Sequence, residues 1–171
     1  MSLPNTAVSS QMHAATTGKG AAILILPSGR TLSATFNIDK FVSINDMEAQ
    51  AFYRAIKHFD NMISYRYIHY ISDNTSLLAG LRRGLSQSFS MNYWVQKITA
   101  ELHKRRSYVK TLHYVPSASN PADPATRGTR VTDIHRTTLR IILNFLRKWG
   151  GGGGCTVPGH RQRGRLPLTK Q

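Results

Sequence analysis

The order of strand-like and helix-like segments between residues 21 and 115 is the feature that most constrains the fold. Residues 21–26 and 31–38 are apolar or β-branched and are separated by Pro27, Ser28 and Gly29, a pattern that predicts a β-hairpin. The pattern continues with a helix over 45–63, a strand over 65–72, helices over 75–83 and 90–106, and a strand over 107–115. This order predicts an α/β layered domain whose later strands are joined through helices.

The first predicted helix has the clearest periodicity. Asn45 is expected to cap it, with Glu48 three positions later completing a capping box. Glu48 also precedes Phe52, Ala55 and Phe59 by four, seven and eleven residues, so its carboxylate is expected on the helix face that packs on the sheet. Two explanations of Glu48 therefore stay open, a cap and a functional acid.

The charge of the chain indicates the class of its partner. Among 171 residues, 23 lysines and arginines stand against 8 acids, for a net charge of +15. Such a balance favours nucleic acid, with an acidic membrane surface as the weaker alternative. The single cysteine, Cys155, excludes an internal disulfide framework and multi-cysteine zinc modules. No apolar run approaches the roughly 18 residues of a membrane span and no secretory signal is evident, so we expect an intracellular, cytoplasmic or nuclear, protein without membrane partners.

The chain is expected to divide into three parts. Residues 1–128 contain the α/β pattern. Residues 129–149 are expected to contain a basic amphipathic helix, because apolar and basic side chains alternate at helical spacing over 132–149. The glycine run at 150–154 opens a basic tail over 150–171 that has no apolar period and is predicted to be disordered.

Three acids stand at positions where chemistry is plausible. Besides Glu48, Asp73 ends an apolar strand and Asp123 lies in a turn-rich loop; a cap or a turn explains each of them alone. Together they are predicted to converge at one sheet edge, where three carboxylates would repel one another without bound cations. Oxygen ligands of this kind suit Mg²⁺ or Mn²⁺, and two such ions support hydrolysis of a phosphodiester.

Three motifs give the chain a family resemblance. They are Met47-Glu48-Ala49, Ile71-Ser72-Asp73-Asn74, and Tyr114-Val115-Pro116-Ser117 followed by Asn120-Pro121-Ala122-Asp123. Over residues 13–128 the chain resembles the ribonuclease H domain of reverse-transcribing elements, the retrotransposon polyproteins and pararetroviruses. The resemblance implies a mixed five-stranded sheet with flanking helices, and four acids that bind two Mg²⁺ ions and cut the RNA strand of an RNA–DNA hybrid. It also implies a polymerase domain upstream in the same polyprotein.

By this resemblance Glu48, Asp73 and Asp123 match the second, third and fourth metal-binding acids, and His13 stands at the position of the first. A neutral imidazole ligates one metal through one nitrogen and cannot bridge two ions. Residues 7–12 are also less apolar than a central strand should be. We therefore expect a weak or truncated first strand and impaired hydrolysis, as in a degenerate copy of the domain. The alternative is a non-catalytic module that binds nucleic acid.

Six basic residues are candidates for contact with phosphates on a surface beside the third predicted helix. They are Arg82, Arg83, Lys97, Lys104, Arg105 and Arg106. An ordinary solvated helix face explains them equally well.

Overall fold

A computed structural model describes residues 5–12, 18–26, 28, 30–38, 43–117, 120 and 122. These residues form five strands and four helices. In chain order they are β1 (Asn5–Met12), β2 (Lys19–Ile25), β3 (Thr31–Asn37), α1 (Ile44–His58), α2 (Asp60–Ile63), β4 (Tyr67–Ser72), α3 (Thr75–Arg83), α4 (Phe89–Lys104) and β5 (Tyr108–Tyr114). The predicted helix at 129–149 and the tail at 150–171 lie outside the described residues.

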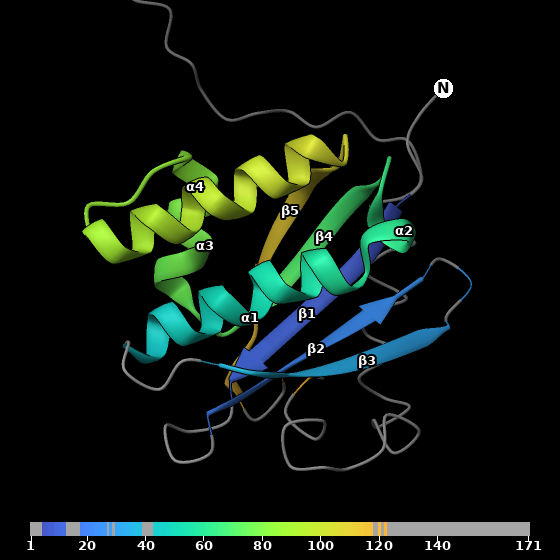
Figure 1. The fold of residues 1–171 in the computed structure, drawn as a ribbon, viewed down its shortest axis with the longest axis horizontal. Helices are drawn as coiled ribbons and strands as arrows, with labels where there is room; N and C mark the ends of the chain where they lie inside the picture. The colour runs from blue at the N-terminus through green and yellow to red at the C-terminus, as the bar shows by residue number, and fades with distance from the viewer. Residues whose placement is uncertain are drawn as a thin grey trace, which may run out of the picture.

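The five strands form one mixed sheet in the order β3-β2-β1-β4-β5 (Figure 1). The predicted hairpin is confirmed as β2 and β3, which pair antiparallel. β2 also pairs antiparallel with β1, whereas β1, β4 and β5 are parallel. The parallel strands bring the carboxyl ends of β1 and β4 to the same edge of the sheet.

The first strand differs from the expectation. β1 is eight residues long and occupies the centre of the sheet, paired with β2 from Ala7 to Met12 and with β4 from Asn5 to Ser9. The expected weakness came from its modest apolar content. A central strand is held by backbone hydrogen bonds on both edges, and these do not depend on its side chains. Its neighbours carry the apolar residues instead: Ala21 to Ile25 of β2 are fully buried.

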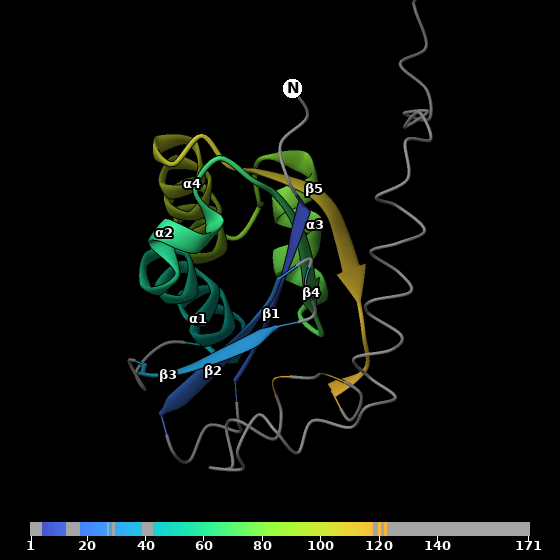
Figure 2. The same ribbon diagram turned by 90° about the vertical axis from the view of Figure 1, so that its right-hand side faces the viewer.

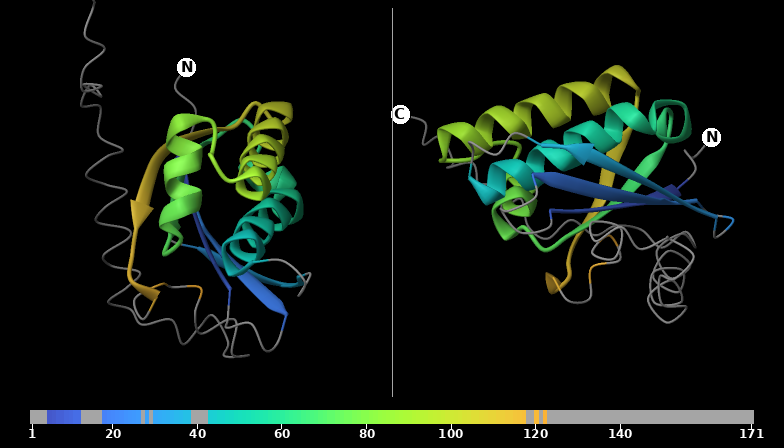
Figure 3. Two further views of the ribbon diagram at one scale, coloured as in Figure 1. Left: turned by 90° about the vertical axis from the view of Figure 1, so that its left-hand side faces the viewer. Right: turned by 60° about the horizontal axis from the view of Figure 1, so that its bottom comes forward.

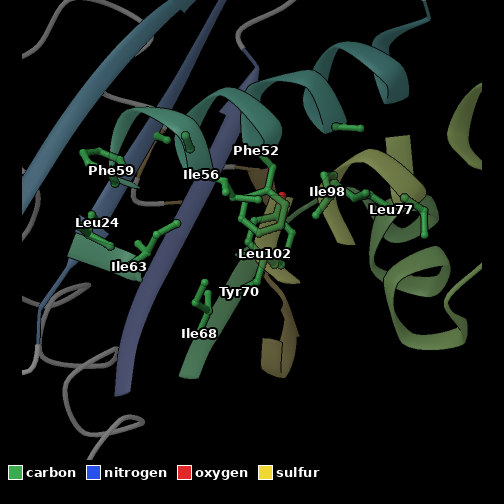
Figure 4. Packing of buried hydrophobic residues seen from close by; sticks show 14 of the residues in the cluster. Leu24, Phe52, Ile56, Phe59, Ile63, Ile68, Tyr70, Leu77, Ile98 and Leu102 are labelled. Carbon is green, nitrogen blue, oxygen red and sulfur yellow. The ribbon is translucent and has the colours of Figure 1, made fainter. Parts of the chain in front are cut away.

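The helices α1, α3 and α4 pack on one face of this sheet (Figure 2). Figure 4 shows the core that joins the two layers, in which Phe52 of α1 stacks on Tyr70 of β4 with ring centroids 3.7 Å apart. Ile98 and Leu102 of α4 and Leu77 of α3 complete this core cluster. The predicted period of α1 is confirmed, since Phe52, Ala55 and Phe59 are all buried. The spacing of apolar residues along α1 thus predicted correctly which side chains of this helix face the sheet.

The start of α1 corrects the predicted cap. Ser43 caps the helix: its hydroxyl accepts a hydrogen bond from the Asp46 N–H at 3.2 Å and donates one to the Asp46 carboxylate at 2.7 Å. The N-cap is therefore Ser43, with Asp46 as its partner, and the predicted capping box of Asn45 with Glu48 was wrong. Asparagine and serine cap equally well, so the chain offers two nearby candidates, and the structure selects the earlier one.

Other element ends follow the local chemistry. α3 stops at Gly84, whose φ of 74° is the left-handed conformation that glycine adopts readily. The single helix predicted to residue 63 is divided at Phe59 into α1 and the short α2. Phe59 and Ile63 are buried on both sides of this break, which is why the apolar period continues through it. Within the described part of the chain, no helix is long and apolar enough to cross a membrane.

Candidate active site

Two of the predicted acids meet at the carboxyl edge of the parallel strands. Glu48 lies in the second turn of α1, partly buried, and Asp73 follows directly on β4. Burial raises the pKa of Glu48 to about 7, and the negative charge of Asp73 contributes further to the rise. A hydrogen bond from the Asn74 side chain acts in the opposite direction. The structure thus brings two carboxylates together, and the negative charge of Asp73 opposes the ionisation of Glu48.

Neither acid has a structural role at a helix end. Ser43 caps α1, with Asp46 as its partner, which leaves Glu48 outside the cap. The cap of α3 is Asn74, whose side-chain oxygen accepts the Leu77 N–H at 2.9 Å, and not Asp73. The local explanations available from the sequence are therefore removed for both carboxylates.

Asn74 connects the two elements that carry these acids, and sequence reasoning did not single it out. Its Nδ2 donates to the backbone oxygen of Asn45 at 3.1 Å, so the start of α3 is tied to the first turn of α1. Its own N–H donates to Ser72 Oγ at 3.1 Å. Asn74 is 3% exposed, and a buried amide with this many partners fixes the relative position of its neighbours. The available signal was an N-cap residue directly before a helical period.

The loop after β5 reaches Asp73. Ser117 Oγ donates to the Asp73 carboxylate at 2.6 Å, and Asn120 Nδ2 donates to its other oxygen at 3.4 Å. Asn120 and Ala122 are buried, although they belong to a loop. Ser117 and Asn120, both from the third family motif, therefore lie at the same sheet edge as Asp73. Asp123 and His13 lie outside the described residues.

The donor set at this edge suits a hard divalent cation. Both groups are carboxylates, and a cation beside them would favour the charged form of Glu48, which burial and the charge of Asp73 disfavour. Among the described residues, no three acidic, histidine or cysteine side chains gather in one group that could hold a metal ion. Glu48 and Asp73 thus offer part of a coordination sphere for Mg²⁺ or Mn²⁺.

The N-terminal ends of α1, α3 and α4 lie on the same side of the domain (Figure 3, left). Residues of these three ends line a polar cavity of about 450 Å³. Arg83 lines it, together with the cap residues Ser43 and Ser88 and the first-turn residue Thr75; the acid Asp46 also lines it, with its carboxylate accepting from the Ser43 hydroxyl. Helix N-termini carry partial positive charge, and hydroxyl groups and guanidinium donate hydrogen bonds, so this chemistry favours an anionic group such as a phosphate. Asn45, which accepts the hydrogen bond from Asn74, also lines the cavity and connects it to the two acids.

The six candidate cations are distributed over both ends of the helical layer. Arg82 and Arg83 are exposed in the last turn of α3, and only Arg83 lines the polar cavity. Lys97 is exposed in the middle of α4. Lys104 and Arg106 are exposed at the C-terminal end of α4, the end opposite to Asp73.

Arg105 is enclosed rather than available. Its side chain is 10% exposed and pairs with Asp60 at 2.5 Å and with Glu101. Its backbone oxygen accepts a hydrogen bond from Tyr65. The guanidinium therefore joins the ends of α4 and α2, and its charge is already compensated within the protein.

Comparisons with known proteins agree with this architecture. The family model of reverse transcriptase-like proteins matches residues 5–127. A search of curated proteins gives no match.

Solved structures of ribonucleases H share the fold at low sequence identity. Ribonuclease H1 from the archaeon Halobacterium salinarum is 12% identical with a TM-score of 0.52, over 71% of this chain and 92% of that one. The N-terminal ribonuclease H domain of a Mycobacterium tuberculosis protein is 10% identical with a TM-score of 0.57, over 73% and 98%. The ribonuclease H1 LC11, solved with an RNA/DNA hybrid, is 12% identical with a TM-score of 0.57, over 73% and 94%. The chain belongs to the reverse transcriptase-like family and is a ribonuclease H-like domain with the mixed α/β fold of these enzymes.

Proposed function

We propose that this chain is the ribonuclease H domain of a retroelement polyprotein, that its family activity is two-metal hydrolysis of RNA in RNA–DNA hybrids, and that His13 at the first acid position impairs this activity. The observation that carries the proposal is the pair formed by Glu48 and Asp73 at the carboxyl edge of the parallel strands. The pair has no capping role, and the raised pKa of Glu48 reflects burial beside a second carboxylate. Such an arrangement costs stability in the absence of a cation, which supports a functional origin.

Glu48 and Asp73 would hold Mg²⁺ or Mn²⁺, together with Asp123 and with His13 in place of the first acid. When bound, such ions activate a water molecule and stabilise the leaving oxygen of a phosphodiester. Asn74 holds α1 and α3 together so that the Glu48 carboxylate stays beside Asp73. Ser117 donates to Asp73 and limits the rotation of its carboxylate.

The proposed substrate is an RNA–DNA hybrid. The similar LC11 enzyme was solved with such a hybrid, which supports this assignment. The polar cavity is lined by Arg83, by residues of three helix N-termini and by Asp46, and its hydrogen-bond donors could bind a backbone phosphate of the hybrid. The exposed cations Arg82, Lys97, Lys104 and Arg106 would add contacts that do not depend on sequence.

The test is cleavage of a labelled RNA–DNA hybrid by the full chain in Mg²⁺ and in Mn²⁺. We expect slow cleavage by the unmodified chain, and an increase of about 100-fold or more in His13→Asp, because an aspartate can bridge two ions. Asp73→Asn should abolish cleavage in both backgrounds. Asp60→Asn is the matched control, since it removes an acid at the opposite end of the helical layer, and its rate should equal that of the parent. Rapid cleavage that Asp73→Asn does not affect would show that the active site lies elsewhere.

The second candidate is a module that binds nucleic acid without cutting it. The replacement of the first acid by His13 favours it, because the basic surface and the fold do not depend on that position. On this account a folded His13→Asp variant stays inactive, and the chain binds the hybrid with an affinity that Asp73→Asn leaves unchanged.

A further inference from the structure

A second basic and aromatic surface lies on the outer side of the helical layer. α1 and α4 run side by side over the sheet (Figure 3, right), and between them and β3 is a cavity of about 460 Å³, which we call the aromatic groove. It is lined by the rings of Phe36, Tyr53, His58 and Trp94 and by the cations Arg54 and Lys57. No acidic side chain lines it among the described residues.

The groove is separate from the acid pair. Tyr53, Arg54 and Lys57 follow Glu48 by five, six and nine residues, which places them on the opposite stripe of α1. Their neighbours Phe52, Ala55 and Phe59, on the Glu48 side, are buried against the sheet. A ligand in the groove therefore does not occupy the proposed active site.

The rings of Tyr53 and Trp94 in the groove are only partly covered, and Tyr53 has a cation close by. Tyr53 and Trp94 lie with centroids 5.8 Å apart and are both partly exposed. Lys57 Nζ lies 5.5 Å from the Tyr53 centroid. Next along α4, Tyr93 is 50% exposed, contacts Trp94 edge-on at 5.2 Å, and has Lys97 Nζ at 5.3 Å from its ring. Aromatic surface and positive charge thus alternate from α1 across to α4.

The positive charges of Arg54 and Lys57 indicate which kind of ligand suits the aromatic groove. Arg54 and Lys57 are exposed and form no ion pair with a residue of the described ranges, so an anionic partner would gain their full attraction. Partly exposed rings beside unpaired cations are the combination that binds single-stranded nucleic acid, with bases stacked on rings and phosphates on cations. A duplex keeps its base faces stacked internally and cannot use the rings in this way.

We propose that the aromatic groove binds single-stranded RNA or DNA, with bases against Tyr53 and Trp94 and phosphates on Arg54 and Lys57. This site is independent of the proposed hydrolysis. It would hold an unpaired strand that continues from, or accompanies, a duplex on the other side of α1.

The test uses the full chain and a fluorescein-labelled oligouridylate in EDTA, which prevents any metal-dependent cleavage. Fluorescence anisotropy gives the affinity, and quenching of tryptophan emission reports stacking. We expect Trp94→Leu and Lys57→Gln each to weaken binding by about fivefold or more, and Trp94→Leu to remove most of the quenching. Tyr53→Leu is the reserve variant should Trp94→Leu not fold.

The matched control is Lys110→Gln. Lys110 Nζ lies 5.4 Å from the Tyr67 ring on the strands β4 and β5, so this variant removes the same charge from the same kind of pair outside the groove. Its affinity should stay within about twofold of the parent. An equal loss in Lys110→Gln and Lys57→Gln would overturn the proposal in favour of diffuse attraction to the net charge.

Two competitors and one further variant complete the experiment. Polyphosphate and an acidic peptide are tested as competitors that displace the labelled oligouridylate. If Trp94→Leu weakens the binding of either competitor as much as it weakens that of the oligouridylate, the groove does not recognise unpaired bases, and its partner is a different anion. Asp73→Asn should bind the oligouridylate like the parent, so a failure of the proposed hydrolysis leaves this result intact. Loss of single-strand binding in Asp73→Asn would place the strand at the acid pair and contradict the proposal.

Discussion

Glu48 carries most of the functional argument at the scale of single residues. Its side chain is directed toward the sheet by the same turn geometry that buries Phe52, and it lies beside Asp73 without a helix-capping role. Burial and the neighbouring charge raise its pKa from 4.5 to about 7. A carboxyl group that is harder to ionise in the folded chain than in the unfolded chain reduces stability above its unfolded pKa.

This shift predicts how stability depends on pH. As pH rises from 4.5 to about 7, the unfolded chain loses the Glu48 proton first, so the folded state of the parent loses up to about 3 kcal/mol relative to a neutral side chain. Glu48→Gln should therefore gain stability over the parent progressively between these pH values and keep a constant advantage above pH 7. Urea unfolding in EDTA at several pH values measures the difference.

Glu101→Gln is the control for this prediction. Glu101 is paired with Arg105, so its replacement should lower stability instead of raising it. An advantage of Glu48→Gln that does not change between pH 4.5 and 7 would mean that the carboxyl group is not held in the environment described here.

The sequence predicted the direction of Glu48 and its convergence with Asp73, but not the hydrogen bonds that hold the two elements together. Helical spacing is a local property, so the shared face of Glu48 and Phe52 follows from the chain alone. The contact of Asp73 with Ser117 joins positions 44 residues apart and depends on the strand order, which no local pattern encodes. The same reason explains why Asn74 was overlooked, since its partner Asn45 lies in another helix.

At the scale of elements, the contact between α3 and α4 depends on a glycine. A Cβ atom placed on Gly80 would lie 2.7 Å from Val95 Cγ2, much closer than carbon atoms approach in proteins. Val95 is fully buried and its branched side chain has little freedom to move away. Gly80 therefore allows the two helices to approach each other at this point.

Gly80→Ala should lower the free energy of unfolding by about 1–3 kcal/mol, although alanine is the better helix former by about 1 kcal/mol. The double variant Gly80→Ala, Val95→Ala should lose less free energy of unfolding than the two single variants lose together, because the smaller side chain at position 95 removes the overlap. Thermal and urea unfolding of the four chains measure this coupling.

Gly84→Ala is the control that distinguishes a packing clash from backbone strain. Gly84 has a φ of 74° and no atom within 4 Å of an added Cβ, so alanine there is strained without a clash. Its cost should be the same with and without Val95→Ala. Strict additivity for Gly80→Ala and Val95→Ala would contradict the packing account.

The predicted elements agree closely with the observed ones where apolar period and turn chemistry coincide. β2, β3, β4 and α3 lie at or near their predicted positions, and α3 ends at Gly84 as expected. β1 was underestimated because a central strand can be recruited by backbone pairing alone. Hydrophobic content is therefore a weaker guide to a strand at the centre of a sheet than to a helix that packs on it.

At the scale of the whole molecule, the strand order brings residues that are far apart in the sequence to the same edge of the sheet. The parallel arrangement of β1, β4 and β5 brings Asp73, the loop at Ser117 and the start of α1 to one edge. The same arrangement leaves the outer side of α1 and α4 free for the aromatic groove. Exposed positive charge accordingly lies in two places, with Arg83 at the polar cavity and Arg54 and Lys57 at the aromatic groove.

The central claim is that the edge formed by Glu48 and Asp73 is a divalent cation site, and calorimetric titration of Mn²⁺ into the full chain at about pH 7 tests it most directly. Because burial beside Asp73 keeps Glu48 partly protonated at this pH, we predict binding accompanied by proton release, seen as a dependence of the heat on the buffer. Asp73→Asn should abolish this binding, while Asp60→Asn should retain it. Absence of binding, or binding that Asp73→Asn leaves unchanged, would contradict the account.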